Sequence, residues 1–466
     1  MAEAKTVHFV GIGGIGMSGI AEILGRSGYK IHGSDLRQNI ETERLKGLGA
    51  IIFEGHKPEN VKDADVVVFS SAVSPNNPEI LEAKRKHIPV LSRTEMLAEL
   101  MRKKHSIVVA GAHGKTTTSA MITTMLLECG YDPTAVIGGR LKRIASNAKF
   151  GTDNWFVAES DESDGSFLRL LPTVSVITNI DREHMDHYGS YARLEQAFVE
   201  FANRVPFDGK VIICLDDRGS REVVPKIERP IFTYGIEEDA DLKAIDIELS
   251  DSGTSFVIYH HNEKIGGVHL TVLGLHNILN CLGAAAVGLH LGIHPDQICK
   301  SLGAFSGIDR RMDLKGEVKG IRVVDDYAHH PTEIAATLKV LRIYSKGRGR
   351  IKVLFQPHRY SRLGDLWERF VEVFDLVDEV IVTPVYAASE KSIIGIDSPT
   401  LVSSISKRGK TQTRYSTSIE EGVSILCENV NPGDLLVTMG AGDITKAASI
   451  ILKRLGELHE NRKGNQ

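Results

Sequence analysis

The sequence predicts an α/β fold of three domains: a Rossmann-like first domain, a central domain built on a phosphate-binding loop (P-loop) with a small antiparallel β patch, and a Rossmann-like third domain. Short apolar runs at residues 7–10 and 107–109 pass directly into glycine turns that open helices. Further strand and helix patterns alternate along the chain, which is typical of doubly wound parallel sheets. A length of 466 residues suits about three domains. We expect them to span 1–104, 105–308 and 309–466.

The composition indicates a soluble globular protein, with 42% hydrophobic and 25% charged residues. A formal net charge of -4 gives no electrostatic reason to expect binding to nucleic acid or to an anionic membrane. No apolar run reaches the ~18 residues of a membrane span, and we expect no signal peptide. The 5 scattered cysteines form no C-x-x-C pair, which favours free thiols and a cytoplasmic protein. Monomer and homodimer both remain open.

The first glycine turn, residues 11–16, satisfies G-x-G-x-x-G between a strand and a helix, and Asp35 ends the next strand. Glycines let a pyrophosphate approach the backbone, and the acid can bind a ribose hydroxyl. Both NAD and a UDP-sugar meet this geometry, so a dehydrogenase remains an alternative. His56 lies in a later loop, where its surroundings alone predict an exposed side chain rather than a ligand contact.

The second glycine turn organises the central domain. Residues 111–114 follow a buried strand, and Lys115 and Thr116 open a helix that we expect to run to about Cys129. The first amides of a helix suit phosphate oxygens, Lys115 adds a point charge, and Thr116 offers a hydroxyl to Mg²⁺. The G-x-x-G-K-T spacing is two residues shorter than the general P-loop pattern. We expect Lys115→Ala to abolish activity nearly completely while sparing the fold.

Acidic and histidine residues follow two further central strands. The strand at 155–158 ends in Glu159 and the rest of the acidic segment 159–164, and the strand at 173–180 leads to His184 and His187. Acids at this edge of the sheet can hold Mg²⁺ opposite the phosphates. Glu159, His184, Asp186 and His187 are also compatible with a zinc site, with His184 and His187 on one helical face. The neighbouring phosphate turn favours magnesium.

The rest of the central domain predicts paired strands at 255–259 and 268–273, and then a helix opening at 274–280. Asn277 and Asn280 lie three residues apart on one face of that helix, where their amides can give and take hydrogen bonds at an adenine edge.

Two strands of the third domain also end in polar clusters. Residues 325–330 follow the strand at 321–324, and residues 356–362 follow the strand at 351–355. Arg359 and Arg362 are spaced by one helical turn, a suitable fork for a carboxylate or phosphate. Such clusters at strand ends are hard to explain by packing and favour a functional role.

Taken together, these motifs resemble those of the Mur ligase family, and the shortened P-loop matches this family's own version. The likeness runs from about residue 6 to about residue 455. The motifs that carry it are GIGGIGMSGIA, GAHGKTTT, ESDESDGSF, TNIDREHMDHYG, HNILN, DDYAHHPTE and FQPHRYSR.

The resemblance implies an ATP-dependent amide ligase of peptidoglycan synthesis that uses Mg²⁺. The carboxylate of UDP-N-acetylmuramate would take the γ-phosphoryl group of ATP, and the amine of L-alanine would attack the acyl phosphate. Ligases for later amino acids carry a carbamylated lysine after the H-x-D motif. No lysine occurs between Asp186 and Phe201, which fits the alanine-adding member and leaves the ligands of a second magnesium open.

The resemblance also implies roles for individual residues. Residues with catalytic roles are Lys115, His184, His329, Arg359 and Arg362, and metal ligands are Thr116, Glu159 and His184. ATP contacts are Gly111, Ala112, His113, Gly114, Lys115, Thr116, Thr117, His276, Asn277, Asn280, Arg311 and Asp326. UDP-sugar contacts are Gly11, Gly13, Gly14, Ile15, Gly16, Asp35, His56, Ser70 and Ser71, and amino-acid contacts are Tyr327, His358, Arg359 and Arg362.

Two more alternatives share these motifs. A peptide-recycling ligase would attach a whole peptide to the same sugar nucleotide, so that only its amine pocket differs. A non-catalytic nucleotide-binding module would bind the same ligands without releasing phosphate.

Overall fold

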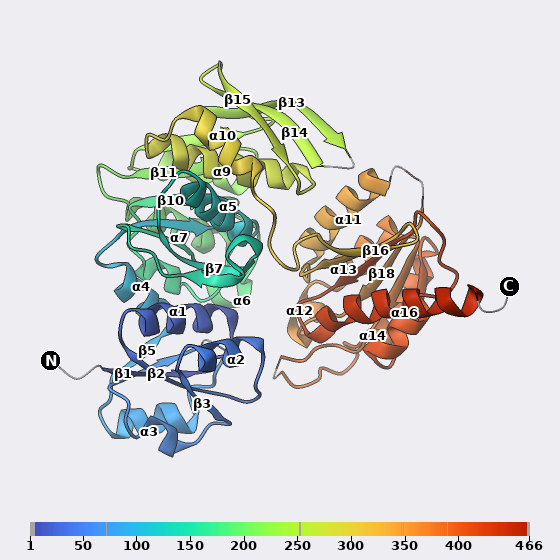
Figure 1. Ribbon diagram of the computed structural model, residues 1–466, viewed down its shortest axis with the longest axis horizontal. Coiled ribbons are helices and arrows are strands. Elements are labelled where there is room, and N and C mark those ends of the chain that lie inside the picture. The colour runs from blue at the N-terminus through green and yellow to red at the C-terminus, as the bar shows by residue number, and fades with distance from the viewer. Residues whose placement is uncertain are drawn as a thin grey trace. The chain divides into compact units, whose positions relative to one another are not determined.

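The computed structural model describes residues 5–463, apart from 71, 251, 252, 346, 348 and 389. Its contacts divide the chain into two compact units (Figure 1). The first unit contains most of the chain up to Ser306, and the second consists chiefly of the chain from Gly307 onward. The α/β fold with three sheets, one for each expected domain, is confirmed, whereas the exact domain boundaries stay a prediction.

The first sheet has five parallel strands in the order β3-β2-β1-β4-β5. Its central strand β1 is buried throughout, as the apolar run predicts. The strand order reverses at β1 and β4, and ligands of open α/β sheets bind at such a switch point. The elements are β1 Thr6–Val10, α1 Ile15–Arg26, β2 Lys30–Asp35, α2 Ile40–Gly47, β3 Ile51–Glu54, β4 Val66–Phe69, α3 Pro78–Arg85, β5 Val90–Ser92 and α4 Arg93–Met101.

The second sheet has ten strands in the order β15-β14-β13-β12-β11-β10-β6-β9-β7-β8. Its middle strands are parallel, and the expected antiparallel patch is present as β14 and β15. Strand β8 adds an antiparallel edge beside β7. The strands are β6 His105–Ala110, β7 Thr134–Leu141, β8 Ser146–Lys149, β9 Trp155–Glu159, β10 Val174–Ile177, β11 Lys210–Cys214, β12 Ile231–Gly235, β13 Leu242–Ser250, β14 Gly253–His260 and β15 Glu263–Leu270.

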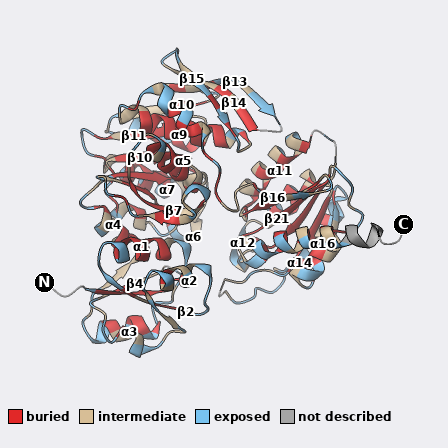
Figure 2. Cartoon of the chain, viewed as in Figure 1, coloured by how far each residue is buried: buried red, intermediate tan, exposed pale blue. Residues whose placement is uncertain are grey.

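Helices α5 and α9 pack side by side in the first unit, and both are largely buried (Figure 2). Small residues allow the close approach: a methyl group at Gly288 of α9 would lie 2.8 Å from the sulfur of Met125 in α5. The P-loop helix therefore has a fixed position in the core. The helices are α5 Lys115–Glu128, α6 Met185–Tyr188, α7 Tyr191–Asn203, α8 Arg218–Val223, α9 Leu275–His290 and α10 Pro295–Gly303.

The second unit contains a six-stranded sheet in the order β16-β17-β21-β18-β19-β20. Strands β17, β21, β18, β19 and β20 are parallel to one another. Strand β16, which was not predicted from the sequence, pairs with β17 in the antiparallel direction. The elements are β16 Asp313–Val318, β17 Ile321–Asp326, α11 Pro331–Ser345, β18 Ile351–Phe355, α12 Tyr360–Asp365, α13 Trp367–Val373, β19 Glu379–Val382, α14 Ser398–Arg408, β20 Gln412–Tyr415, α15 Ile419–Leu426, β21 Leu435–Met439 and α16 Ala447–Lys463.

All five cysteines are free thiols, and four of them are buried, whereas Cys129, which caps the C-terminus of α5, is partly exposed. Burial raises the pKa of the Cys214 thiol to about 12 and that of Cys299 to about 11. Among the described helices, none combines the length and apolar character that crossing a bilayer requires.

Candidate active site

The P-loop connects β6 to α5 at the carboxyl edge of the central sheet. Gly111 has φ +131° and Gly114 has φ +82°, conformations that favour glycine. A methyl group at Gly111 would lie 2.2 Å from Thr178 Oγ1, so this glycine is also required by close packing. Lys115 begins α5, and the first amides of this helix lack a preceding turn to bond to. They can therefore receive phosphate oxygens.

Asn179, which follows β10, holds the P-loop in this shape. Its side-chain oxygen accepts the His113 N–H at 2.8 Å, and its backbone oxygen accepts the Ala112 N–H at 3.3 Å. The imidazole of His113 lies 3.2 Å from Asp181 Oδ2. The amides of Ala112 and His113 are thus already paired within the protein, which leaves the start of α5 as the main phosphate seat.

Lys115 folds back onto its own loop and onto the acidic segment after β9. Its Nζ donates to the carbonyl oxygens of Gly111 at 2.5 Å and Ala112 at 3.1 Å, and it lies 3.0 Å from Glu162 Oε2. Burial opposes the charged form, but the carboxylates of Glu162 and Asp161 outweigh it and raise the pKa of Lys115. Lys115 is therefore a cation at neutral pH.

The predicted adenine contacts of α9 brace the P-loop in this structure. Asn280 Nδ2 donates to Asn277 Oδ1 at 3.1 Å, and Asn280 Oδ1 accepts from Thr118 of α5 at the same distance. A methyl group at Gly114 would lie 2.5 Å from this same oxygen. Both asparagines are buried, and His276 opens the same helix. Their contact with adenine stays a prediction.

The donor set at the carboxyl edge of β9 fits a divalent cation. Glu159 Oε2 is buried and has no hydrogen-bond partner among the described residues. Thr116, the other predicted ligand from the P-loop helix, is also buried. An unpaired buried carboxylate oxygen is costly, so a bound cation at Glu159 would satisfy it. A separate group, Glu162, Glu183 and His184, has ligand atoms that all lie within 4.8 Å of one another.

The expectation that His184 and His187 share a helical face is wrong. His184 has φ +57° and precedes α6, which begins at Met185, so the two imidazoles do not follow helical spacing. His184 Nε2 lies 3.6 Å from Glu183 Oε2, whereas His187 is exposed and lies beside Gly165. The zinc site considered from the sequence required both histidines on one helical face, so the structure no longer supports it.

The glycine turn of the first domain follows β1, as predicted. Gly11 has φ +81°, and a methyl group at Gly13 would lie 2.9 Å from Asp35 Oδ2, which accepts the Gly13 N–H at 2.8 Å. Gly14 and Ile15 are exposed at the start of α1. Asp35 thus orders the turn, and its contact with a ligand stays a prediction. Ser70 follows β4, and Ser71 lies outside the described residues.

His56 is half-buried, so the expectation of an exposed side chain is wrong. Its Nδ1 lies 2.9 Å from Ser34 Oγ and 3.2 Å from Glu79 Oε2. Glu79 is fully buried and also accepts from Asn60 Nδ2 at 2.5 Å. The sequence reading missed Glu79 because it lies on α3, outside any strand end. This network fixes the ring of His56.

In the second unit, the residues after β17 and β18 form an aromatic and basic cluster. The rings of Tyr327 and His329 have centroids 5.1 Å apart, and those of His329 and His358 are 5.8 Å apart. Arg362 Nη1 lies 3.2 Å from His358 Nδ1, and the guanidinium of Arg311 lies 5.1 Å from the Tyr327 ring centroid. Five of the predicted residues therefore meet in one place.

Burial lowers the pKa values of both histidines in this cluster. His329 falls to about 4, mainly through burial, with Arg362 also contributing. His358 falls to about 3 through burial, His329 and the neighbouring arginines. Both rings are neutral at pH 7. Burial also raises the pKa of Asp326 to about 6, and its two oxygens accept the N–H groups of Met312 and Ala328 at 2.7 Å each.

The expected helical fork of Arg359 and Arg362 is wrong in its geometry. Arg359 has φ +69° and precedes α12, which begins at Tyr360, so only Arg362 lies on the helix. Arg359 is exposed, and its backbone N–H donates to the backbone carbonyl oxygen of Tyr386 at 2.9 Å. Tyr386 was missed by the sequence reading, and its ring stacks on His358 at 5.5 Å. No local pattern marks this contact, because Tyr386 lies beyond the next strand.

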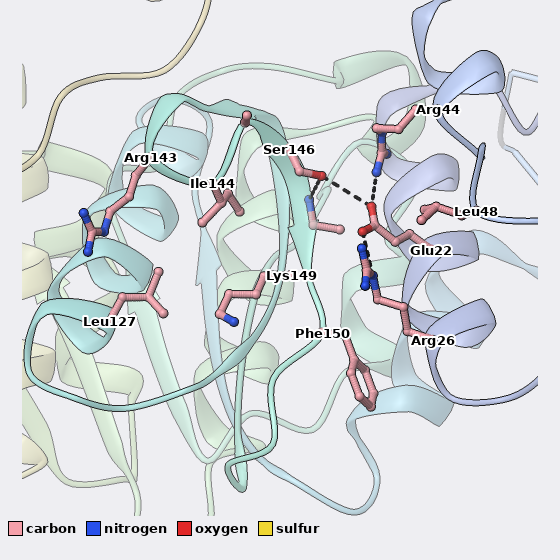
Figure 3. Close-up of a pocket in the computed structure, with 12 residues that line it drawn as sticks. Glu22, Arg26, Arg44, Leu48, Leu127, Arg143, Ile144, Ser146, Lys149 and Phe150 are labelled. Carbon is pink, nitrogen blue, oxygen red and sulfur yellow. Dashed lines mark hydrogen bonds and ion pairs between the residues drawn. The ribbon is translucent and has the colours of Figure 1, made fainter. Parts of the chain in front are cut away.

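A hollow in the first unit is lined by residues of the first and central domains (Figure 3). Its volume is about 760 Å³, and Glu22 sits on its wall between Arg26, Arg44 and Ser146. Glu22 is paired with Arg26 at 2.9 Å and contacts Arg44, so α1 and α2 are joined across this wall. The lining residues are Glu22, Arg26, Arg44, Leu48, Leu127, Arg143, Ile144, Ala145, Ser146, Ala148, Lys149 and Phe150, none of which is a predicted site residue.

The chain matches three family descriptions in succession. Residues 6–105 match the Mur ligase family, catalytic domain; residues 109–288 match the Mur ligase middle domain; and residues 310–442 match the Mur ligase, glutamate ligase domain.

Curated relatives and solved structures also support membership of the Mur ligase family. The chain is 47% identical over 463 residues to UDP-N-acetylmuramate--L-alanine ligase of Geobacter sp. (strain M21), covering 98% of this chain and 99% of the relative. It is similar to a UDP-N-acetylmuramate-alanine ligase structure from Thermotoga maritima, with TM-score 0.84, 28% identity, and coverage of 97% and 99%. A murein peptide ligase from Psychrobacter arcticus shares the fold, with TM-score 0.74, 24% identity, and coverage of 97% and 99%. The resemblance predicted from the motifs is confirmed, and this chain belongs to the Mur ligase family.

Proposed function

We propose that this enzyme joins L-alanine to the carboxylate of UDP-N-acetylmuramate at the expense of ATP, giving UDP-N-acetylmuramoyl-L-alanine, ADP and phosphate. The single observation that carries the proposal is the pairing of the Lys115 P-loop with the acidic edge of β9, in a chain that belongs to an ATP-dependent ligase family. A carboxylate is a poor electrophile until one oxygen becomes a leaving group, and phosphorylation by ATP provides this.

In this proposal the protein binds the triphosphate at the start of α5. The amides there receive phosphate oxygens, and Lys115 turns from Glu162 to the γ-phosphate, whose negative charge it offsets during transfer. Mg²⁺, held by Thr116 and Glu159 with His184 near a second ion, would supply further charge neutralisation. Fixed positions of these groups favour in-line transfer to the carboxylate.

We propose that the cluster of the second unit orients the amino acid. His329 Nδ1 lies 3.0 Å from the Tyr327 carbonyl oxygen, which can only accept, so its proton is on Nδ1 and Nε2 is an acceptor. His358 Nδ1 accepts from Arg362, so its Nε2 carries the proton and donates. One acceptor and one donor, with Arg359 and Arg362, suit the ammonium and carboxylate groups of alanine.

The proposal is tested by incubating the protein with ATP, Mg²⁺ and UDP-N-acetylmuramate, together with either L-alanine or a tripeptide. We expect phosphate release and a product that is heavier than UDP-N-acetylmuramate by one alanine residue. We also expect L-alanine to be strongly preferred over the tripeptide. A strong preference for the tripeptide would support the peptide-recycling alternative instead. No phosphate release with all substrates present would favour a binding module, and tight NADH binding that UDP cannot displace would favour a dehydrogenase.

A further inference from the structure

Arg93 lies against the glycine turn of the first domain, although it is distant from this turn in sequence. A methyl group at Gly16 would lie 2.6 Å from Arg93 Nη1 and 3.2 Å from its Cδ. Gly16 has no positive φ that would require glycine. Its missing side chain makes room for the guanidinium, which therefore rests on the first turn of α1.

This position is electrostatically unfavourable for a cation that has no negatively charged partner. The start of α1 carries the positive end of the helix dipole, where anions are stabilised and cations are not. Arg93 is also the first residue of α4, so its charge lies at the start of a second helix. A cation held in such a place is stabilised only when negative charge joins it.

The protein itself supplies an anion for Arg93, the partly exposed Asp161. Arg93 Nη2 lies 3.2 Å from Asp161 Oδ2, and these side chains are 30% and 41% exposed. Burial opposes the charged form of Asp161, but the nearby charge of Arg93 helps to lower the pKa of this carboxyl to about 2, so the two side chains form an ion pair in the ligand-free protein. Asp161 belongs to the acidic segment that also contains Glu162, so Arg93 lies between the glycine turn of the first domain and the P-loop region.

We propose that Arg93 is a further substrate-binding residue, which contacts the pyrophosphate of the nucleoside diphosphate seated at the start of α1. The inference rests on the proposed function, because it takes the sugar nucleotide as the ligand of this turn. A planar guanidinium gives a phosphate two parallel hydrogen bonds, and it adds to the amides of the helix terminus. The incoming pyrophosphate competes with Asp161 for Arg93.

The test uses two probes that differ only in the phosphates: UDP and uridine. Calorimetric titration of the full-length protein gives the affinity for each. We expect Arg93→Met to weaken UDP binding tenfold or more while changing uridine binding less than twofold. Arg93→Lys keeps the charge without the fork and should recover part of the UDP affinity.

Two controls separate ligand contact from structural support. Arg102→Met removes the same charge from the opposite end of α4, where Arg102 is 70% exposed, and should leave both affinities unchanged. Asp161→Asn releases Arg93 from its partner and should leave UDP binding equal or tighter. Equal weakening of UDP and uridine by Arg93→Met, or a loss of UDP affinity in Asp161→Asn as large as in Arg93→Met, would overturn the assignment.

The same experiment distinguishes failure of this inference from failure of the proposed function. If the wild-type protein binds neither probe, the assignment of a sugar-nucleotide site to the start of α1 is wrong, and the inference about Arg93 is wrong as well. If the wild-type protein prefers UDP and Arg93→Met keeps that preference, the proposed function stands and the role of Arg93 alone is wrong.

Discussion

Lys115 Nζ lies 3.0 Å from Glu162 Oε2, so the cation proposed to meet the γ-phosphate is paired with a carboxylate of its own protein. The Lys115 side chain is 19% exposed and that of Glu162 is 3% exposed. Removing either partner alone leaves a charge with little access to water. The pair therefore links the stability of the P-loop region to the residue proposed for catalysis.

We expect Lys115→Ala to lower the ligation rate by at least about a hundredfold, because it removes a charge aimed at the transferring phosphoryl group. The pairing changes the expectation from sequence that this substitution spares the fold. An uncompensated Glu162 should cost about 3 kcal/mol of unfolding free energy. Denaturant unfolding measures this loss, and Lys115→Ala combined with Glu162→Gln should recover most of it without restoring activity. Wild-type turnover in Lys115→Ala would contradict the assignment.

The magnesium assignment predicts the same defect from two different substitutions. Glu159→Gln removes a proposed ligand, and Gly138→Ala places a methyl group 1.7 Å from Glu159 Oε1 and so displaces it. We expect both to weaken apparent Mg²⁺ affinity roughly tenfold to a hundredfold, measured by titrating ADP binding with Mg²⁺. Glu128→Gln, a substitution at the far end of α5, should have no effect. Unchanged Mg²⁺ dependence in Glu159→Gln would remove Glu159 from the metal site.

The neutral histidines of the second unit predict a pH-dependent stability. His329 and His358 have folded pKa values of about 4 and about 3, below the unfolded value of about 6.5. Their contribution is complete above pH ~6.5 and falls as the pH decreases, because the unfolded chain takes up the protons first. The slope from each is about 1.4 kcal/mol per pH unit. Asp326, whose folded pKa is raised to about 6, acts in the opposite direction.

His358→Gln should remove the contribution of His358 to the pH dependence of the unfolding free energy. Asp326 contributes equally in the wild-type and variant proteins, so its effect cancels in the comparison. The chain has only two tryptophans, so replacing Trp155 with Phe leaves Trp367, which packs in the core of the second unit, as the reporter of its unfolding. Denaturant curves between pH 7.5 and about 4.5 then give the slope. Identical slopes with and without His358 would show that this ring titrates normally.

Gly111 should tolerate a side chain less well than other glycines with positive φ. Gly111→Ala strains a φ of +131° and brings a methyl group 2.2 Å from Thr178 Oγ1 and 2.8 Å from the Asn179 oxygen. Gly130, which follows α5, has φ +85° and no heavy atom within 4 Å. We expect a loss of about 1 kcal/mol for Gly130→Ala and of about 3 kcal/mol or more for Gly111→Ala. Equal losses in denaturant unfolding would show that packing adds nothing.

Local patterns predicted much of this fold because they fix local geometry. The glycine turns before α1 and α5, the helix that begins at Lys115 and the antiparallel patch follow from residues that are adjacent in the chain. Patterns fail where one residue leaves the regular geometry. His184 and Arg359 both adopt positive φ just before a helix, so that counting by helical turns misplaced their partners.

Partners from distant segments were the other source of error. The contacts of Asn179 with the P-loop, of Glu79 with His56, and of Tyr386 with His358 all join separate elements. No spacing rule relates such positions. The predicted strand 173–180 included Asn179, whereas β10 ends at Ile177 and leaves Asn179 free to reach the P-loop; this contact depends on strand order, which the sequence leaves undetermined.

The distribution of thiols has a practical consequence. Four cysteines are shielded from reagents, and the remaining one, Cys129, ends the same helix that Lys115 begins. A maleimide dye should therefore attach at a single position without any cysteine being replaced. The dye would mark the end of α5 that lies opposite the P-loop, so the natural chain can be labelled in its central domain at a known distance in sequence from Lys115.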